Sequence, residues 1–385
     1  MKICFLSCEY GPNLAGGEGV VTQSLAEGMA ALGHQVRVAG LLERGCREPC
    51  LEERNGVTIH RLPIPPVRGG GFWARHHLWK QVLAWAKAGE IDVVDAPLGR
   101  GLVAGWGALP IPVIVRIHGT RAARMSPLAP PVPLVSQWFE RHAAQRADFL
   151  CAVSRSVAQF VTRRILGEDR DYTVIPNPVS GLGDAYWHPQ PPPSVVYSGG
   201  MNECKGICEL VRVWARVRGQ VPEARLLLFG RDNRMHDGVS VREWVCDFLR
   251  EPKGLGVEFR GHVSRRELAL AYRRAGAVVL PSHYEAFGMA AAEAMWCGCP
   301  LVFTQYGSGP ELVRDGIEGL LVNPHQPDSI AEALLRTLLE PEFAAGLGRA
   351  AAAKARAEFS TERVLARNLQ FYEDCRARFA AAGTR

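Results

Sequence analysis

The chain has 385 residues, 47% of them hydrophobic, and a formal net charge of +6. This length exceeds what one core usually holds, so we expect two domains of about 150–200 residues. No apolar run reaches the roughly 18–20 residues of a membrane span, the N-terminus lacks the pattern of a signal peptide, and no basic run interleaved with aromatics indicates nucleic-acid binding. We therefore expect a cytoplasmic protein without a nucleic-acid partner.

The first half alternates short apolar runs with helical stretches. A helix is predicted over residues 19–33, with Gly33 at its C-cap. Strands are predicted at residues 2–8, 34–41, 57–63, 91–96, 112–119 and 147–153. Buried strands connected by helices are typical of a parallel sheet with crossover helices. This half therefore predicts a Rossmann-like, doubly wound domain.

A glycine-rich turn separates the first strand from the first helix. Gly16, Gly17 and Gly19 lack a Cβ, so backbone N–H groups there can approach a phosphate. Thr22 stands where a dinucleotide fingerprint requires glycine. The turn alone fits a phosphate-binding loop or a tight turn without a ligand.

A second strand–helix series follows a linker rich in proline and glycine at residues 176–193. Its predicted strands are residues 194–200, 224–230, 257–261, 277–282, 300–304 and 319–322. Ser264 and Glu267 have the spacing of a capping box that opens a helix. We expect an N-terminal domain at 1–180, a C-terminal domain at 181–360, and a helix at 361–385 that packs back on the first domain.

Three further features lie where strands of such domains end. His118 follows an apolar strand and fits either a sugar-contacting histidine or a structural one. Lys205 ends a glycine-containing loop and fits either a diphosphate contact or a solvated lysine. Glu285 and Glu293 lie eight residues apart in PSHYEAFGMAAAEAMWCGCP. Eight helical residues span about 12 Å and return to nearly the same face, so the two carboxylates could grip an extended ligand with a diphosphate in its middle.

Together these motifs resemble the retaining family 4 glycosyltransferases of the GT-B architecture, over nearly the whole chain. The resemblance rests on GGEG at 16–19, RIHGT at 116–120, VIPNPV at 174–179, the loop ending at Lys205 and Gly206, the segment from Glu285 to Glu293, and residues 307–324. It implies two Rossmann-like domains that face a central cleft. It also implies transfer of a sugar from a nucleotide diphosphate sugar to a hydroxyl acceptor, with retention of anomeric configuration.

The resemblance also implies a role for each matching residue. Glu293 would bind the ribose and Glu285 the hexose near the reacting centre, while Lys205 would neutralise the leaving diphosphate. The backbone amides of Phe287, Gly288 and Met289 would hold sugar and diphosphate, Gly16 and Gly17 would approach the diphosphate, and His118 would contact the transferred sugar. No metal or other cofactor is expected, because the lysine and the helix N-terminus would supply the positive charge.

The chain departs from the family pattern at Gly200, where family members commonly carry an arginine that shares the charge of the leaving group. A missing cation would weaken stabilisation of a dianionic leaving group. Either Arg231 or Arg260 replaces it, or turnover is weak.

Residues 69–89 combine three tryptophans with Arg75, His76, His77 and Lys80. The pattern favours an ordinary helix that buries its tryptophans on the first sheet. The alternative is peripheral contact with an anionic membrane surface, and the net positive charge of residues 1–180 agrees with it. We expect acceptor contacts on loops 66–80 and 120–136.

Two other functions remain open at this stage. One is another GT-B activity, such as a sugar-nucleotide epimerase or a phosphorylase. The other is a non-catalytic, sugar-nucleotide-binding subunit of a glycan-assembly complex. This alternative stays open because Gly200 stands where family members commonly carry an arginine. The sequence does not identify the nucleobase, the sugar or the acceptor.

Overall fold

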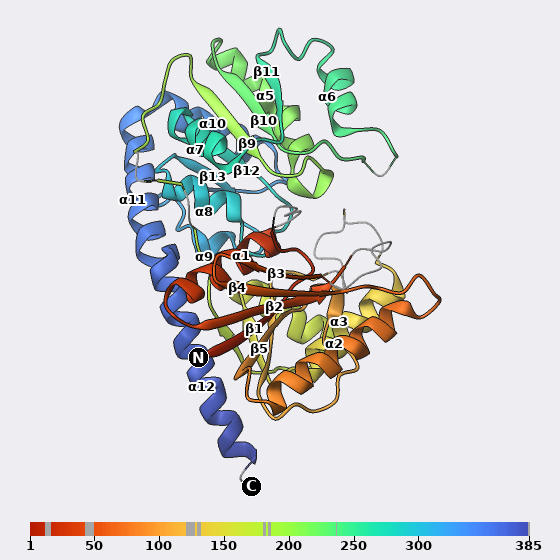
Figure 1. Cartoon of the computed structure of the whole chain (residues 1–385). Helices are drawn as coiled ribbons and strands as arrows, with labels where there is room; N and C mark the ends of the chain where they lie inside the picture. The colour runs from red at the N-terminus through yellow and green to blue at the C-terminus, as the bar shows by residue number, and fades with distance from the viewer. Residues whose placement is uncertain are drawn as a thin grey trace. The chain divides into compact units, whose positions relative to one another are not determined.

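The structure is a computed structural model, and it divides the chain into two compact units. The residues described are 1–11, 17–42, 50–120, 128, 132–179, 182–183, 186–235 and 237–383. Unit 1 is formed mainly by Met1–Met125, Pro131–Pro178 and Thr361–Arg385, and unit 2 mainly by Val179–Ser360. The C-terminal helix thus belongs with the N-terminal residues (Figure 1).

Unit 1 is built on an eight-stranded sheet with the order β3-β4-β2-β1-β5-β6-β7-β8. Its strands are β1 (Lys2–Leu6), β2 (Gln35–Leu41), β3 (Cys50–Arg54), β4 (Val57–Leu62), β5 (Val93–Pro97), β6 (Val113–Ile117), β7 (Phe149–Ala152) and β8 (Tyr172–Val174). Its helices are α1 (Gly17–Ala31), α2 (Gly70–Lys87), α3 (Leu134–Arg146), α4 (Arg155–Val161) and α12 (Thr361–Gly383), with a short turn η1 (Gly99–Gly101). Apart from β3, all neighbouring strands are parallel, as the apolar runs predict.

Unit 2 is built on a six-stranded parallel sheet with the order β11-β10-β9-β12-β13-β14. Its strands are β9 (Ser194–Ser198), β10 (Arg225–Phe229), β11 (Val257–Gly261), β12 (Ala277–Leu280), β13 (Leu301–Thr304) and β14 (Leu320–Val322). Its helices are α5 (Ile207–Gln220), α6 (Val241–Leu249), α7 (Arg265–Arg274), α8 (Met289–Trp296), α9 (Gly309–Leu312), α10 (Asp328–Leu339) and α11 (Pro341–Phe359), with a short turn η3 (Glu203–Lys205). The predicted fold of two doubly wound α/β domains is confirmed.

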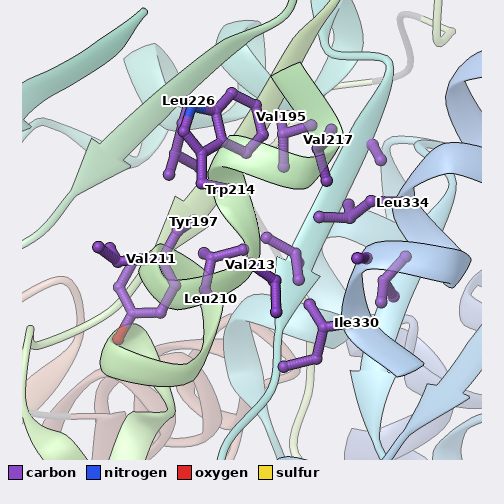
Figure 2. Packing of buried hydrophobic residues seen from close by; sticks show 14 of the residues in the cluster. Val195, Tyr197, Leu210, Val211, Val213, Trp214, Val217, Leu226, Ile330 and Leu334 are labelled. Carbon is purple, nitrogen blue, oxygen red and sulfur yellow. The ribbon is translucent and has the colours of Figure 1, made fainter. Parts of the chain in front are cut away.

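The core of unit 2 lies between the sheet and helices α5 and α10 (Figure 2). Trp214 is fully buried in it and donates from Nε1 to the backbone oxygen of Leu255 at 2.8 Å, so its polar atom is satisfied. Val195, Leu226 and Ile330 pack in the same cluster from two strands and a second helix. This packing fixes the strand from which the Lys205 loop leaves the sheet.

Local signals in the sequence set several helix ends. Gly33 follows α1 with φ +85°, a left-handed conformation that glycine adopts at low cost. Ser264 and Glu267 form the predicted capping box of α7, since each side chain accepts from the other residue's backbone N–H. One edge of the first sheet was not predicted: β3 pairs antiparallel with β4, in a stretch without a strong apolar run.

The C-terminal helix α12 docks on the first sheet through a buried polar network. Arg116 on β6 forms an ion pair with Asp95 on β5, with 2.5 Å between Nη2 and Oδ2. On α12, Asn368 accepts from Arg116 at 2.6 Å, and Tyr372 donates from its hydroxyl to Asp95 at 2.6 Å. Arg116, part of the RIHGT motif, is therefore buried and structural.

Candidate active site

The candidate site of unit 2 lies where the winding direction of its sheet reverses. The chain leaves β9 toward β10 on one side and reaches β12 on the other, so β9 and β12 are neighbours at a switch point. Open parallel sheets bind ligands at the carboxyl ends of strands at such a point. The loop with Lys205 follows β9, and the loop with Glu285 follows β12.

The structure brings Lys205 and Glu285 into contact. Lys205 Nζ lies 2.5 Å from Glu285 Oε1, and the Ser282 hydroxyl donates to the same oxygen at 3.0 Å. The lysine side chain remains 36% exposed and the carboxylate 15%, so the cation is accessible to a ligand while its position is fixed. Asn202 accepts from the backbone N–H of Lys205 and so closes the turn that carries it.

Backbone contacts tie these two loops together. Gly206 has φ +69°, and a Cβ there would lie 2.0 Å from the backbone oxygen of Pro281, so only glycine fits. The backbone N–H of His283 donates to Cys204 at 2.9 Å. The buried His283 ring also lies 3.4 Å from Glu209, measured from Nε2 to Oε2. No local sequence pattern singles out this histidine.

The pKa of the Glu209 carboxylate is affected by its contact with His283. Burial is the largest single influence and acts to raise the pKa of Glu209, but the nearby His283, the residue's own backbone N–H and the charge of Arg212 together leave that pKa below its ordinary value. Because Glu209 lies in the first turn of α5, directly after the Lys205 loop, the pair connects the start of this helix with the loop after β12.

The prediction that eight helical residues separate Glu285 from Glu293 is wrong. Helix α8 begins only at Met289, and Glu285 lies in the loop before it. Gly288 is the N-cap residue with φ +87°, and a Cβ there would lie 2.8 Å from the ring of Phe303. The strand β12 ends at Leu280, a loop follows, and the left-handed Gly288 turns the chain from that loop into the helix.

The start of α8 offers backbone N–H groups beside the Lys205–Glu285 pair. The first amides of a helix have no intrahelical acceptor, and Gly288 supplies no side-chain cap. Phe287 is buried, and its backbone oxygen accepts from the Ser308 hydroxyl at 2.8 Å. This hydrogen bond holds the loop that precedes α8 in place. Phe287, Gly288 and Met289 thus lie where an anion would meet the positive end of the helix.

Glu293 lies on α8, is buried and is held by Arg265. The guanidinium donates to Glu293 Oε1 from Nε at 3.1 Å and from Nη2 at 2.7 Å. Arg265 is the first residue of α7, a position set by the Ser264 capping box. No local sequence pattern singles out Arg265, because its partner is 28 residues away along the chain.

Gly200 lies in the loop after β9, against the loop after β10. The Met201 backbone N–H donates to Arg231 at 3.0 Å, and a Cβ on Gly200 would lie 3.2 Å from the side-chain amide of Asn233. Arg231 is exposed, and no ion pair is recorded for it in the described part of the chain. Arg260 instead pairs with Glu258 at 2.7 Å.

The remaining predicted residues belong to unit 1. His118 follows β6, and its Nδ1 is buried with no hydrogen-bond partner among the described residues. Burial, aided by the nearby Arg116 charge, lowers the pKa of His118 to about 3, so the imidazole is neutral at physiological pH. Gly17 is exposed and begins α1, while Gly16 lies outside the described residues.

Unit 1 also has a cavity of about 430 Å³, near the switch point between β1 and β5. It is lined by Cys8, Leu41, Leu42, Ile64, Arg75, Arg100 and Leu102. Arg100 has φ +64°, unusual for a residue other than glycine, and pairs with Glu9 at 2.9 Å. Arg75 donates to the backbone oxygen of Gly101 at 3.0 Å, which supports this turn. An apolar wall with an arginine–carboxylate pair suits a ligand that has both apolar and hydroxyl surfaces.

Two family models match the chain. Residues 185–354 match the model "Glycosyl transferases group 1", and residues 16–178 match "Glycosyl transferase 4-like domain". Each match covers most of one unit.

The chain is also similar to a glycogen synthase and to a D-inositol 3-phosphate glycosyltransferase along most of its length. It is 28% identical to a glycogen synthase of Mycobacterium tuberculosis, with 97% of this chain and 94% of that protein aligned. It is 26% identical to a D-inositol 3-phosphate glycosyltransferase of Streptomyces bingchenggensis, with 88% of this chain and 80% of that protein aligned.

Solved structures share the fold. The sucrose-phosphate synthase of Thermosynechococcus elongatus superposes with a TM-score of 0.77 at 23% identity, covering 97% of this chain and 99% of that one. HepE of Anabaena, solved with UDP and glucose, superposes with a TM-score of 0.70 at 18% identity, covering 97% and 99%. At these identities the likeness supports the two-domain architecture alone.

Proposed function

The chain belongs to the glycosyl transferases group 1 family and is a glycosyltransferase, and from this premise we propose that unit 2 binds a nucleotide diphosphate sugar. The observation that carries the proposal is the contact between Lys205 and Glu285 beside the N-terminus of α8. A cation and free helix amides together suit a diphosphate. Glu293 would accept from the ribose hydroxyls, and Arg265 would hold it in position until they arrive.

We propose that transfer retains the anomeric configuration. The bond between the anomeric carbon and the diphosphate oxygen breaks, and the acceptor oxygen attacks from the same face. The acceptor proton passes to the departing phosphate, and Lys205 stabilises the charge that develops there. Glu285 orients the sugar hydroxyls. The reaction would need no metal ion, because the lysine and the helix N-terminus supply the positive charge.

Product analysis tests this proposal. We expect nucleoside diphosphate release that depends on an acceptor, from a panel of UDP-, ADP- and GDP-sugars. UDP-glucose is the first choice, since HepE is also solved with it. The anomeric proton of the product, observed by NMR, should show the donor's configuration. An inverted product would contradict retention, and donor binding without turnover over a broad acceptor panel would support the non-catalytic alternative.

We propose that the cavity of unit 1 accommodates the hydroxyl acceptor. Its apolar wall would pack on a ring or chain, while the Arg100–Glu9 pair would hydrogen-bond hydroxyls. This assignment differs from the loops 66–80 and 120–136 favoured by sequence alone. Among the described residues that line the cavity, Arg75 alone comes from those loops, and most of the loop 120–136 lies outside the described residues.

Arg231 would supply the second cation that Gly200 lacks. It lies beside Gly200, is exposed and has no recorded ion pair among the described residues, whereas Arg260 is held by Glu258. We expect Arg231→Ala to lower kcat about tenfold or more, and Arg260→Ala, the matched control, to leave it nearly unchanged. Steady-state kinetics with varied donor measures both.

A rescue experiment sharpens this prediction. A Cβ on Gly200 would meet side-chain amides and no backbone atom, with Asn233 at 3.2 Å and Asn202 at 3.8 Å, so Gly200→Arg should restore most of the kcat lost in Arg231→Ala. Equal effects of Arg231→Ala and Arg260→Ala, or no recovery with Gly200→Arg, would argue against Arg231 as the replacement.

We further propose that the enzyme works at the cytoplasmic face of a membrane, in peripheral contact through residues 69–89. Among the described residues, no helix is long and apolar enough to cross a bilayer. In α2, Trp85 is buried, while Trp73 is 51% exposed. The prediction that this helix buries its tryptophans on the first sheet is therefore correct for Trp85 and wrong for Trp73.

A further inference from the structure

The first turns of α2 and α3 carry a group of exposed apolar side chains, here called the α2–α3 patch: Phe72, Trp73, Leu134, Val135 and Trp138. Their exposed fractions are 50%, 51%, 81%, 52% and 39%. The rings of Phe72 and Trp138 lie 5.3 Å apart, and α2 and α3 are neighbouring helices (Figure 1), so the two helices contribute to one surface. Contiguous exposed apolar surface of this kind marks an interaction site.

This patch is separate from the core side of the same helices. On α2, the buried positions are Gly70, Ala74, Leu78, Val82, Trp85 and Ala86. Phe139 on α3 is buried and contacts Phe72 from below, with 4.7 Å between ring centroids. The exposed aromatic rings therefore lie over buried, well-packed residues of the same two helices and are not part of the core.

The charges around the α2–α3 patch are almost all positive. Residues 66–89 contain four Lys/Arg and no Asp/Glu before Glu90 is reached. Residues 132–146 contain Arg141, Arg146 and one acid, Glu140, which is buried and accepts from the Thr120 hydroxyl. Lys80 lies seven residues after Trp73 on the same helical face, and Arg141 lies three residues after Trp138. Both are exposed.

Aromatic residues beside cations on a helix surface are typical of proteins that lie at a bilayer interface. The aromatic rings suit the boundary between headgroups and acyl chains, and the cations suit anionic phosphates. If a second copy of the chain bound here through the same surface, the two positive surfaces would repel each other. A neutral apolar partner would leave the cations without a negatively charged contact. Charge therefore favours an anionic membrane as the occupant.

We propose that the α2–α3 patch is a lipid-binding surface for bilayers that contain anionic phospholipid. The inference deepens the peripheral location proposed above and rests on it. Trp73, Trp138 and Leu134 enter the interface, while Lys80 and Arg141 contact headgroup phosphates. An enzyme held in this way meets acceptors that are themselves anchored in the membrane, so a lipid-linked hydroxyl acceptor is the substrate class that follows.

Vesicle co-sedimentation of the full chain tests the surface. We expect binding to phosphatidylcholine vesicles that contain phosphatidylglycerol, weak binding to phosphatidylcholine alone, and a loss of binding as salt rises. The double variant Trp73→Ser with Trp138→Ser, and separately Lys80→Glu with Arg141→Glu, should each weaken binding to the anionic vesicles roughly tenfold. The matched control is Phe248→Ser on α6 in unit 2, where Phe248 is 48% exposed.

Two further measurements keep the outcomes distinct. Circular dichroism and nucleotide binding by calorimetry should be unchanged in the patch variants, so a failure here leaves the proposed donor site standing. Equal binding to both vesicle types, no binding, or an equal loss in Phe248→Ser would overturn the proposal. So would a dimer in light scattering that dissociates in Trp73→Ser, because a second copy would then occupy the patch.

Discussion

Replacing Lys205 by alanine is expected to lower kcat by about 10²–10³-fold, the range found when one preorganised donor to a developing charge is removed. Lys205 is fixed by the turn that Asn202 closes and by its 2.5 Å contact with Glu285. Because this position is set before the donor arrives, the ammonium would stabilise the leaving diphosphate without reorganisation. The change should appear mainly in kcat, measured as nucleoside diphosphate release at saturating donor.

The controls for this prediction come from the same unit. Lys253→Ala removes another exposed lysine of unit 2 and should leave kcat unchanged. Lys205→Arg keeps the charge and should recover part of the activity. If Lys205→Ala retains full kcat, the cation that serves the leaving group lies elsewhere, and the proposed division of roles in unit 2 is wrong.

Replacing Arg116 by alanine is expected to destabilise unit 1 by ~3–5 kcal/mol, because it leaves a buried carboxylate without its counter-charge. Asp95 and Arg116 are only 3% and 4% exposed, and Asn368 and Tyr372 of α12 complete their hydrogen bonds. The variant should therefore loosen the C-terminal helix together with the sheet. Urea unfolding, followed by circular dichroism, measures the shift of the midpoint.

A double variant and a surface pair test this explanation. Arg116→Met with Asp95→Leu removes both charges, so it should cost less than Arg116→Ala alone. Arg376 and Asp92 lie 3.6 Å apart at the surface of the same unit, and Arg376→Ala should cost under about 1 kcal/mol. Equal costs for the buried and surface arginines would contradict the role assigned to the network.

The sequence predicted the elements of the fold because their signals are local. Apolar runs marked the parallel strands, Gly33 marked the end of α1, and the Ser264–Glu267 spacing marked the start of α7. The edge strand β3 was missed, since an exposed edge carries only a weak apolar pattern. The spacing argument treated Glu285 and Glu293 as parts of one helix, whereas α8 begins only at Met289, after the left-handed Gly288.

The sequence by itself determined that this chain forms two parallel α/β domains and that Lys205, Glu285 and Glu293 are its prominent candidate residues. Only the tertiary structure decided their partners. Lys205 meets Glu285 because β9 and β12 pair as neighbours at a switch point, although their first residues, Ser194 and Ala277, are 83 residues apart along the chain.

The same distinction applies to the arginines. Arg265 holds Glu293, Arg116 lies in the core with Asp95, and Arg231 lies beside Gly200. A sequence pattern records the local preference of each segment, whereas strand order and helix docking depend on the packing of segments that are far apart in the chain. For that reason the candidate catalytic and binding residues could be named from the sequence, and their partners could not.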